Sequence, residues 1–511
     1  MKQILYLLLG CLIPFQFLTA KMYSSPERTP VDYVNPYIGN ISHLLVPTYP
    51  TVHLPNSMLR VYPERENFTG NTINGLPLIV TSHRGSSAFN LSPYQGELQK
   101  AGSIIQYGYD NEVIKPYYYS VDLDDDGMYV QYASSHQSGI YQIDFSQTDK
   151  PAYLIFNTRD GELKTDGKSI SGYQKLGNHT QVYIYLETDQ QPLKIGTHQG
   201  AVIRTTDKST QGHNAYYILE YPKGTASVLL RYGVSFISSE QAKQNLRREI
   251  KNYNLQAVAD KGRSVWNETL GKIFVKGGTE NEKTVFYTSL YRTYERMICI
   301  SEDGRYFSAY DGQVHDDEGI PFYVDDWIWD TYRATHPLRL IIETEMESNM
   351  VNSLIRMAYQ MQPNWMPTFP EINGDSRRMN CNHGVATVLD AYNKGMRSFD
   401  LAKAYQVCKA AITEKTLAPW SSKPAGVLDQ FYKDHGYFPA LAVGEQETVP
   451  EVHSWERRQP AAVTLGTVYD EWCLGNIAQA LGDKKEIKNM FVFRRKYGIV
   501  RPYKNLLTME S

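Results

Sequence analysis

The stretch FYVDDWIWDTYRATHPL combines aromatic rings, carboxylates, an arginine and a histidine within seventeen positions. A helix that begins near Asp326 and ends before Pro337 would place four of these side chains on one face, at spacings i, i+3, i+4 and i+7. The four are Asp326, Trp329, Asp330 and Arg333. A sugar suits such a face, because its hydroxyls bind carboxylates and guanidinium while its C–H face lies on the indole. The pattern predicts a sugar site; an Asp330–Arg333 ion pair and an Asp326 helix cap are the structural alternatives.

A second group of polar side chains lies farther along, in FPEINGDSRRMNCNHGVATVLDAY. Its candidates for contact with a ligand are Glu371, Asn373, Asp375, Asn382 and His383. They precede an apolar helical pattern, and loops in that position carry functional groups more often than element interiors do. Helix capping explains several of them equally well. His383 has two interpretations, a substrate-binding histidine and a buried structural one.

Two acidic stretches have the composition of a metal site without its spacing. The residues HDDE at 315–318 are consecutive and cannot all point at one ion, so they indicate a solvated turn. The segment DLDDDG at 122–127 opens like a calcium loop, but the twelfth position is Ala133 where a glutamate is needed. We interpret it as a hairpin turn. The cysteines are far apart and form no CxxC pair, which excludes a zinc knuckle and indicates free thiols. No metal site is predicted from these residues.

The elements that position these groups change in kind along the chain. Between about residue 31 and residue 236 the sequence consists of short β-branched and aromatic runs bounded by Gly, Pro, Asp and Asn. Examples are 152–158, 182–188, 215–221 and 226–236. These runs predict an all-β sandwich. A polar, Pro-rich loop at 53–70 carries Asn56, Arg60 and Arg65, and we expect it to reach toward the helical part.

Helical patterns dominate the rest of the chain. Ser238 and Gln241 have capping-box spacing and open one or two linker helices, and Thr279 with Glu282 opens the next helix. Asp400 can cap a further helix, and residues 465–482 form another that ends at a glycine. We therefore divide the chain into a signal peptide (1–20), a β-sandwich (21–237), a helical linker (238–272) and a helical domain (273–511).

Composition and the N-terminus narrow the class of protein. The chain has 511 residues and a formal net charge of −3 without a basic cluster, which argues against nucleic-acid binding. The start, MKQILYLLLGCLIPFQFLTA, has the form of a secretory signal peptide, and Leu9-Gly10-Cys11 resembles an early lipoprotein box. No other segment is apolar and long enough to span a membrane. We expect a secreted, periplasmic or outer-membrane-associated monomer.

Several motifs occur in one order and together resemble glycoside hydrolase family 92, the secreted bacterial α-mannosidases. They are DYVNPYIGN, WNETLGKI, FYTSLYRTY, YDGQVHDDEG, WDTYRATHPL, MNCNHGVATVLDAYNKG and VYDEWCLGNIAQALG. The resemblance covers roughly residues 31–486. It implies a multidomain β + α fold with an N-terminal β-sandwich, a helical linker and an (α/α)₆ barrel. It also implies exo-hydrolysis of terminal α-mannose with inversion, assisted by calcium.

The resemblance assigns roles to individual residues. Trp329 and Asp330 match the family's W-D pair at the terminal mannose site, and Arg333 matches the arginine that follows it. With His383, these residues form the expected substrate-binding set for a mannose-containing glycan, with α-1,2 as the expected linkage. An inverting glycosidase also needs one carboxylic acid and one distant carboxylate.

The sequence departs from the family pattern in two places. The loop around HLPNS diverges from the family's Gly- and His-rich form, and the E-G-N-x-W-Q-Y and G-N-x-D-x-G motifs, which carry the general acid and base, do not occur before Ser511. We therefore expect an incomplete barrel, no catalytic residue within the chain and an incomplete set of calcium ligands. A non-catalytic mannoside-binding remnant is the alternative. A third hypothesis is a different glycosidase in which Glu371 and Asp330 act as acid and base.

Overall fold

The computed structural model describes residues 28–40, 48–65, 70–81, 87–123, 127–147, 149–200, 202–379 and 381–483. The signal peptide and lipoprotein box lie outside these residues, as do residues 124–126, where a hairpin turn was predicted, and the segment from 484 to 511. Within the described part, no helix combines the length and the apolar character needed to cross a bilayer.

The first half of the described chain is all-β, as predicted. Its strands are β1 (Val52–His53), β2 (Arg60–Val61), β3 (Thr72–Asn74), β4 (Leu76–Pro77), β5 (Phe89–Tyr94), β6 (Gln106–Lys115), β7 (Tyr118–Leu123), β8 (Met128–Ser134), β9 (Ser138–Asp144), β10 (Ala152–Thr165), β11 (Ser169–Gly177), β12 (Thr180–Thr188), β13 (Lys194–Gln199), β14 (Val202–Arg204), β15 (Ser209–Tyr221) and β16 (Ser227–Ser235). Two short 3₁₀ turns, η1 (Pro30–Tyr33) and η2 (Leu98–Lys100), accompany them. The runs predicted at 152–158, 182–188, 215–221 and 226–236 fall on β10, β12, β15 and β16.

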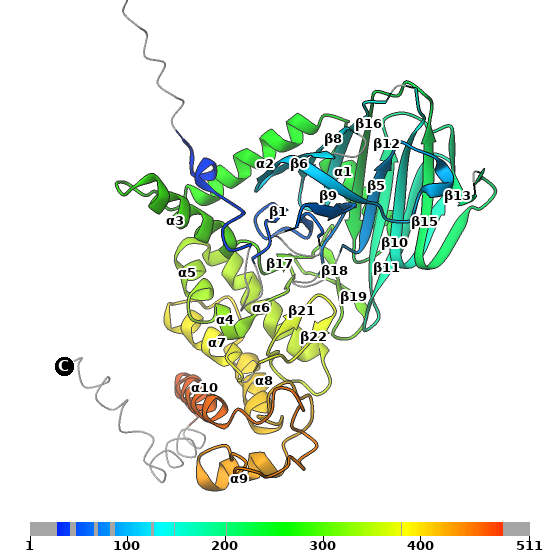
Figure 1. Cartoon of the computed structure of the whole chain (residues 1–511). Coiled ribbons are helices and arrows are strands. Elements are labelled where there is room, and N and C mark those ends of the chain that lie inside the picture. Colours follow the sequence, from blue (N-terminus) through cyan, green and yellow to red (C-terminus); the bar gives the residue numbers. More distant parts are fainter. Residues whose placement is uncertain are drawn as a thin grey trace, which may run out of the picture.

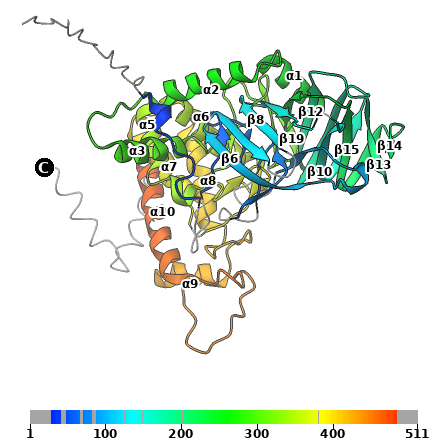
Figure 2. The same ribbon diagram turned by 45° about the horizontal axis from the view of Figure 1, so that its top comes forward.

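Most of these strands form one large antiparallel sheet that divides at β10 (Figures 1 and 2). One edge of β10 pairs with β15 along almost its whole length. Its other edge pairs first with β5 and then with β11. The path continues from β11 through β12, β16, β9, β8, β7 and β6 to β3. The long strand β10 therefore belongs to both branches of the sheet.

Buried tyrosines line the core of the β domain, and their hydroxyls bond to backbone across it. Tyr141 donates to the carbonyl of Pro77 over 2.6 Å, and Tyr232 donates to that of Leu78 over 2.7 Å. Both rings have no exposed surface. An apolar ring with a satisfied hydroxyl is a stable core residue, because the polar tip is not left unpaired. Such pairs account for part of the tyrosine content without any role in ligand binding.

Two helices join the β domain to the second half. Helix α1 (Ser239–Glu249) begins at Ser238, whose side chain accepts a hydrogen bond from the Gln241 backbone N–H. The capping-box prediction is half correct, since the Gln241 side chain donates instead to Asn245 and Asp303. Helix α2 (Leu255–Leu270) follows, capped by Asn254.

Helix α1 packs directly on β16 because Gly233 has no side chain. A Cβ at this position would lie 2.1 Å from the carbonyl oxygen of Ala242. We expect Gly233→Ala to lower the free energy of unfolding by about 1–3 kcal/mol, since helix and strand must move apart. Gly102→Ala, whose methyl would meet its nearest atom at 3.2 Å, is the matched control. Equal denaturant midpoints for the two variants would contradict this packing.

The second half is mainly helical, which confirms the predicted order of an all-β part followed by a helical part. Its elements are α3 (Glu280–Thr293), β17 (Ile298–Cys299), β18 (Arg305–Ser308), β19 (Gln313–Asp316), β20 (Tyr323–Val324), α4 (Ile328–Thr331), α5 (Thr335–Ile342), α6 (Thr344–Gln360), β21 (Pro370–Glu371), β22 (Gly374–Asp375), α7 (Gly384–Asn393), α8 (Leu401–Thr413), α9 (Val427–His435) and α10 (Pro460–Ala480). The capping box at Thr279 and the cap at Asp400 occur as predicted. Helix α10 begins five residues earlier than predicted, with Pro460 in its first turn.

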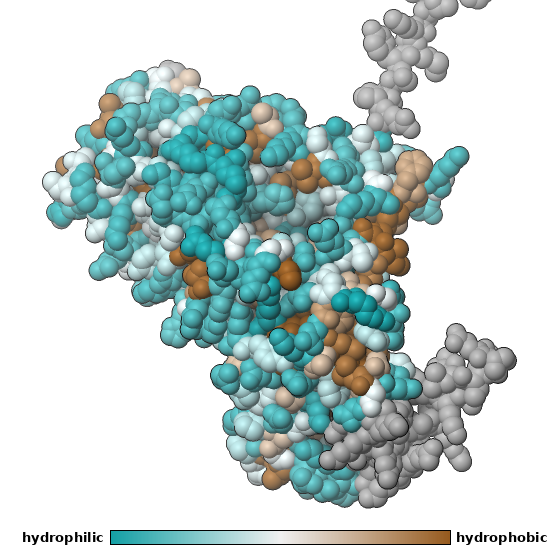
Figure 3. Space-filling view, turned by 180° about the vertical axis from the view of Figure 1, so that it is seen from behind, coloured by the Kyte–Doolittle hydropathy of each residue, from teal (hydrophilic) through white to brown (hydrophobic). Residues whose placement is uncertain are grey.

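Apolar side chains gather on the surface of the helical half. Figure 3 shows them as brown patches on the back of the molecule. The most exposed large apolar residues there include Phe274, Ile341 and Leu465, with 80%, 74% and 73% of their surface accessible. The described elements of the helical half do not cover these side chains.

Candidate functional site

The predicted helix through Asp326, Trp329, Asp330 and Arg333 does not form. The chain leaves β20, makes the single turn of α4, and starts a new helix, α5, at Thr335. Pro337 lies in the first turn of α5, where a missing N–H has no cost, and so it does not end a preceding helix. The segment 325–334 is therefore a loop that contains the single helical turn of α4, and not one continuous helix.

Asp326 lies inside the protein, away from any ligand-facing surface. Its carboxylate accepts a hydrogen bond from Thr331 Oγ1 over 2.9 Å and contacts His336 Nε2 at 2.8 Å. The other ring nitrogen of His336 lies 2.7 Å from Glu347 Oε1 on α6. None of the three residues is more than 1% exposed. The prediction that Asp326 shares a face with Trp329 is wrong, as is its predicted role as a helix cap.

The charges of this buried triad depend on each other. Burial alone would push the pKa of His336 down, but the carboxylates of Glu347 and Asp326 raise it to about 10. The imidazolium in turn keeps the pKa of Asp326 low, against the effect of burial. A histidinium between two carboxylates thus fixes the start of the loop to α5 and α6.

The neighbouring residue, Asp325, ties the same loop to the β domain. Its Oδ2 accepts hydrogen bonds from Arg60 on β2 over 2.7 Å and from Arg296 over 2.5 Å. Arg60 and Asp325 are both about 2% exposed. In the same N-terminal loop, the Asn56 side chain donates to the carbonyl of Met297 over 2.6 Å. The expectation that residues 53–70 reach the helical half is therefore confirmed for Asn56 and Arg60, while Arg65 pairs with Glu112 inside the β domain.

The side chains of Trp329, Asp330 and Arg333 emerge from this anchored loop. Trp329 is partly buried, and Asp330 and Arg333 are exposed. The Arg333 guanidinium lies 5.5 Å from the Trp329 ring centre, a cation–π arrangement. No ion pair joins Asp330 to Arg333 among the described residues, so that structural alternative is not realised. Partial burial raises the pKa of Asp330, against the opposing charge of Arg333.

Tyr332 joins this loop to His383. The ring centres of Tyr332 and His383 are 4.0 Å apart, and Tyr469 of α10 lies 6.1 Å from Tyr332. His383 immediately precedes α7, and its Nδ1 lies 2.6 Å from Asp470 Oδ1 on α10. The second oxygen of Asp470 accepts the backbone N–H of Asn382 over 2.7 Å. The structure thus brings together the two regions that carry the predicted site residues, through Tyr332.

The remaining polar candidates have structural partners. The carboxylate of Asp375 accepts backbone N–H groups of Thr368, Phe369 and Arg377. Glu371 lies 3.2 Å from Arg378, and burial raises the pKa of its carboxyl. His315 pairs with Asp311 at 2.8 Å in the β18–β19 hairpin. These contacts favour a structural role for Asp375 and His315. Glu371 is the exception, because its carboxyl, like that of Asp330, has a raised pKa.

One group within the described residues places three potential metal ligands close together. Donor atoms of Cys381, His383 and Asp470 lie within 4.8 Å of one another, and all three residues are buried. Calcium prefers six to eight oxygen ligands, and a thiol with an imidazole does not fit that preference. Burial also raises the pKa of the Cys381 thiol. The group does not fit calcium, and its observed hydrogen bonds explain it as a brace between α7 and α10.

Sequence analysis missed the residues that anchor the site. His336, Glu347, Asp470 and Tyr332 were not singled out, because their partners are 10 to 88 residues away. Asp470 carried a usable signal, since it is a carboxylate among the mostly apolar residues of the buried face of α10. A charged residue at such a position needs a buried partner.

Comparisons with known proteins agree with this architecture. The sequence model of the glycosyl hydrolase family 92 N-terminal domain matches residues 33–235. That of the family 92 catalytic domain matches residues 241–497.

The chain belongs to glycoside hydrolase family 92.

Structures of other family 92 proteins share the fold. An inverting family 92 mannosidase from Bacteroides thetaiotaomicron has a TM-score of 0.79 and 24% identity, over 92% of this chain and 65% of that one. A family 92 α-mannosidase of the same bacterium, in complex with mannoimidazole, has a TM-score of 0.78 and 21% identity, over 91% of this chain and 63% of that one. An uncharacterised secreted glycosidase of Arthroderma benhamiae is 21% identical over 93% of this chain and 63% of its own length. This family 92 chain spans less than two thirds of these relatives.

Proposed function

We propose that this protein is an α-mannosidase that binds the terminal mannose of a glycan at Trp329, Asp330, Arg333 and His383. The observation that carries the proposal is the loop 325–334, which is fixed from both halves of the chain and presents an indole, a carboxylate and a guanidinium outward. Membership of family 92 and its mannosidase neighbours support this substrate class. Secretion of a relative supports action outside the cytoplasm.

The chemistry of the side chains gives each a role in binding. The Trp329 ring would lie against the C–H face of the sugar, with Arg333 polarising its other side. Asp330 would accept hydrogen bonds from two adjacent hydroxyls, and its raised pKa brings part of its titration closer to neutral pH. His383 is held in one orientation by Asp470, so its second nitrogen is available to the ligand. We assign binding to these residues and assign the acid and base steps of hydrolysis to none of them.

Finer points belong to the same proposal. The preferred linkage is α-1,2, hydrolysis proceeds with inversion, and calcium assists it. The described residues do not supply an oxygen cage for calcium, so the proposed role of calcium rests on the family alone. The protein is secreted to the periplasm or to the outer surface, where it acts on mannose-containing glycans as a monomer.

The proposal is tested by incubating the full chain with α-1,2-mannobiose, with and without calcium. We expect release of mannose with inverted anomeric configuration, followed by NMR. Trp329→Ala should weaken mannoside binding roughly tenfold, because a stacking contact contributes about 1–1.5 kcal/mol. Trp455→Ala, at a tryptophan that is 74% exposed elsewhere on the helical half, is the matched control and should bind normally.

Three outcomes distinguish the hypotheses. Binding without release of mannose, at any calcium concentration, would show the non-catalytic mannoside-binding alternative. Release that is abolished by Glu371→Gln while binding persists would support the assignment of acid and base to Glu371 and Asp330. If wild-type protein and Trp329→Ala bind mannosides equally, the site is elsewhere and the proposal is wrong.

A further inference from the structure

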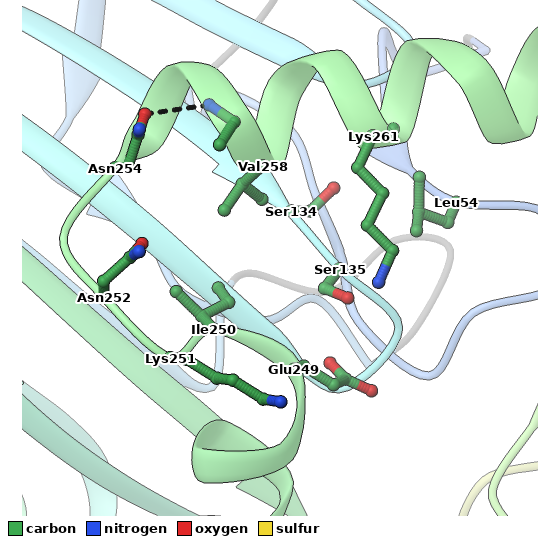
Figure 4. A pocket seen from close by; sticks show the side chains of 12 residues that line it. Leu54, Ser134, Ser135, Glu249, Ile250, Lys251, Asn252, Asn254, Val258 and Lys261 are labelled. Carbon is green, nitrogen blue, oxygen red and sulfur yellow. Dashed lines mark hydrogen bonds between the residues drawn. The ribbon is translucent and has the colours of Figure 1, made fainter.

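A cavity of about 210 Å³ lies on the β-domain side of the linker helices, separate from the loop 325–334 (Figure 4). Three elements meet around it. They are the end of α1 with the segment that follows, the first turns of α2, and the end of β8. The wall consists of Leu54, Ser134, Ser135, Glu249, Ile250, Lys251, Asn252, Asn254, Ala257, Val258, Lys261 and Gly262. Most of the side chains that carry polar groups here are not used by the fold.

Ser134 gives the first sign that the cavity takes a ligand. The residue is 1% exposed, and its hydroxyl has no hydrogen-bond partner among the described residues. In Figure 4 this hydroxyl faces α2, on the wall of the cavity. A buried hydroxyl without a partner is destabilising by about 1–3 kcal/mol, and such groups are rare in folded proteins. A bound polar group in the cavity would satisfy it.

The charges of the residues that line the cavity indicate the charge of the bound group. Lys251 and Lys261 come from different elements of the wall; in Figure 4 the ammonium group of Lys261 points into the space below α2, and that of Lys251 lies beside the last turn of α1. Neither has an ion-pair partner within the described ranges. Helix α2 also begins here, at its Asn254 cap, and the N-terminal end of a helix favours negative charge. Two ammonium groups, a hydroxyl and a helix N-terminus together favour an anion.

Glu249 is the one acidic side chain of the wall. Burial raises the pKa of its carboxyl, against the hydrogen bond from the Gln137 N–H and the charge of Arg248. The basic groups near the cavity are Lys251, Lys261, Arg248 and His136, and burial together with Lys261 lowers the pKa of His136. Protonated Glu249 would donate to an anion, and ionised Glu249 would repel it. Removal of the Glu249 charge should therefore strengthen anion binding.

We propose that this cavity is a binding site for a small oxyanion, a phosphate group held by Lys251, Lys261 and the Ser134 hydroxyl. The site lies between α2 and the end of β8, which belong to different parts of the chain. A bound phosphate would therefore fasten the linker to the β domain. This function is independent of mannose binding at the loop 325–334.

The test measures phosphate binding to the full chain by calorimetry, at constant ionic strength kept with chloride. We expect saturable binding of one inorganic phosphate, and weaker binding of acetate. Combined Lys251→Met and Lys261→Met should abolish it, and Ser134→Ala should weaken it roughly tenfold, the loss expected for a hydrogen bond to a charged group. Lys223→Met, at an exposed lysine of the β15–β16 turn, is the matched control and should leave it unchanged.

A fourth variant separates binding from folding. Glu249→Gln keeps the shape and the acceptor for the Gln137 N–H but removes the charge, so phosphate should bind more tightly at pH 8. A purely structural role of Glu249 would not produce tighter binding. Equal phosphate affinity in wild type and in the double lysine variant would mean an adventitious ion only and would overturn the proposal. Tighter binding of acetate than of phosphate would also overturn it, in favour of a carboxylate ligand.

Discussion

Replacing His336 with alanine should lower the free energy of unfolding by about 3–5 kcal/mol, the largest effect expected of a single histidine in this protein. The substitution leaves the carboxylates of Asp326 and Glu347 buried, without the cation that separates them. Arg339 lies 4.0 Å from Glu347 and remains, but two buried carboxylates that lose the cation between them are costly, and partial protonation offsets this cost only in part. Denaturant unfolding at pH 7, followed by circular dichroism, measures the change.

The control is His213→Ala, at an exposed histidine of β15, which should change the stability by less than about 0.5 kcal/mol. A loss below about 1 kcal/mol in His336→Ala would show that the triad does not hold the loop. Mannoside binding should fall together with stability, because the loop that presents Trp329 loses its anchor.

The same histidine predicts how stability depends on pH. The pKa of His336 is about 10 in the folded protein, against 6.5 for an ordinary histidine side chain, so the folded state binds the proton more tightly. The contribution is fully present below pH 6.5 and is lost as the pH rises through 10. The unfolding free energy of the wild type should thus decline over this range by more than that of His336→Gln. Parallel pH profiles for the two proteins would contradict a charged His336.

Asp325→Asn is the second substitution with a large expected effect. Asn fits the positive φ of 68° at this position, so the backbone remains unstrained. Only the charge is removed, which leaves Arg60 and Arg296 in the interior without the carboxylate that both contact. We expect a loss of about 3–5 kcal/mol in the free energy of unfolding, as for other broken buried ion pairs.

The matched control is Asp110→Asn, at an exposed position of β6. It should change stability by less than about 0.5 kcal/mol. Combining Asp325→Asn with Arg60→Met should restore part of the loss, because one of the two uncompensated cations is removed. If the double variant is less stable than Asp325→Asn alone by the full cost of Arg60→Met in the wild type, the two residues are not coupled.

Local sequence signals predicted the elements well where neighbours in the chain decide the structure. The capping box of Thr279 with Glu282 and the cap at Asp400 depend on residues three positions apart, and both occur. The β-branched and aromatic runs bounded by turn residues likewise indicated β10, β12, β15 and β16. Residues that are close together in the sequence determine these features, so they can be predicted from the sequence alone.

The helix expected through Trp329 does not form, because contacts with residues far away in the sequence determine the conformation of this segment. Asp326 satisfied the periodicity of a helix face, yet His336 and Glu347 draw its carboxylate inward. Asp325 is fixed by Arg60, 265 positions earlier in the chain. The hydrogen bonds and ion pairs of these two buried carboxylates outweigh the small preference of a ten-residue segment for a regular helix. A single sequence does not show which distant arginine or histidine supplies the partner.

The sequence therefore indicated which residues come together in the candidate site better than it indicated how they are arranged. Trp329, Asp330 and Arg333 do share one segment, but as a loop, and Arg333 contacts the tryptophan where a carboxylate partner was considered. His383 joins them through an aromatic contact with Tyr332. The two residues are 51 positions apart, so no periodic pattern in the sequence predicts this contact.

The ion pair between Arg60 and Asp325 limits how the two halves of related proteins can be recombined. The β half alone carries the arginine, and the helical half alone carries the aspartate and the loop with Trp329. A chimera that joins the first half of one relative to the second half of another will present this loop correctly only when both members of the pair are kept together. Recombination at the linker is therefore constrained by this buried contact, and the two halves are expected to change in concert.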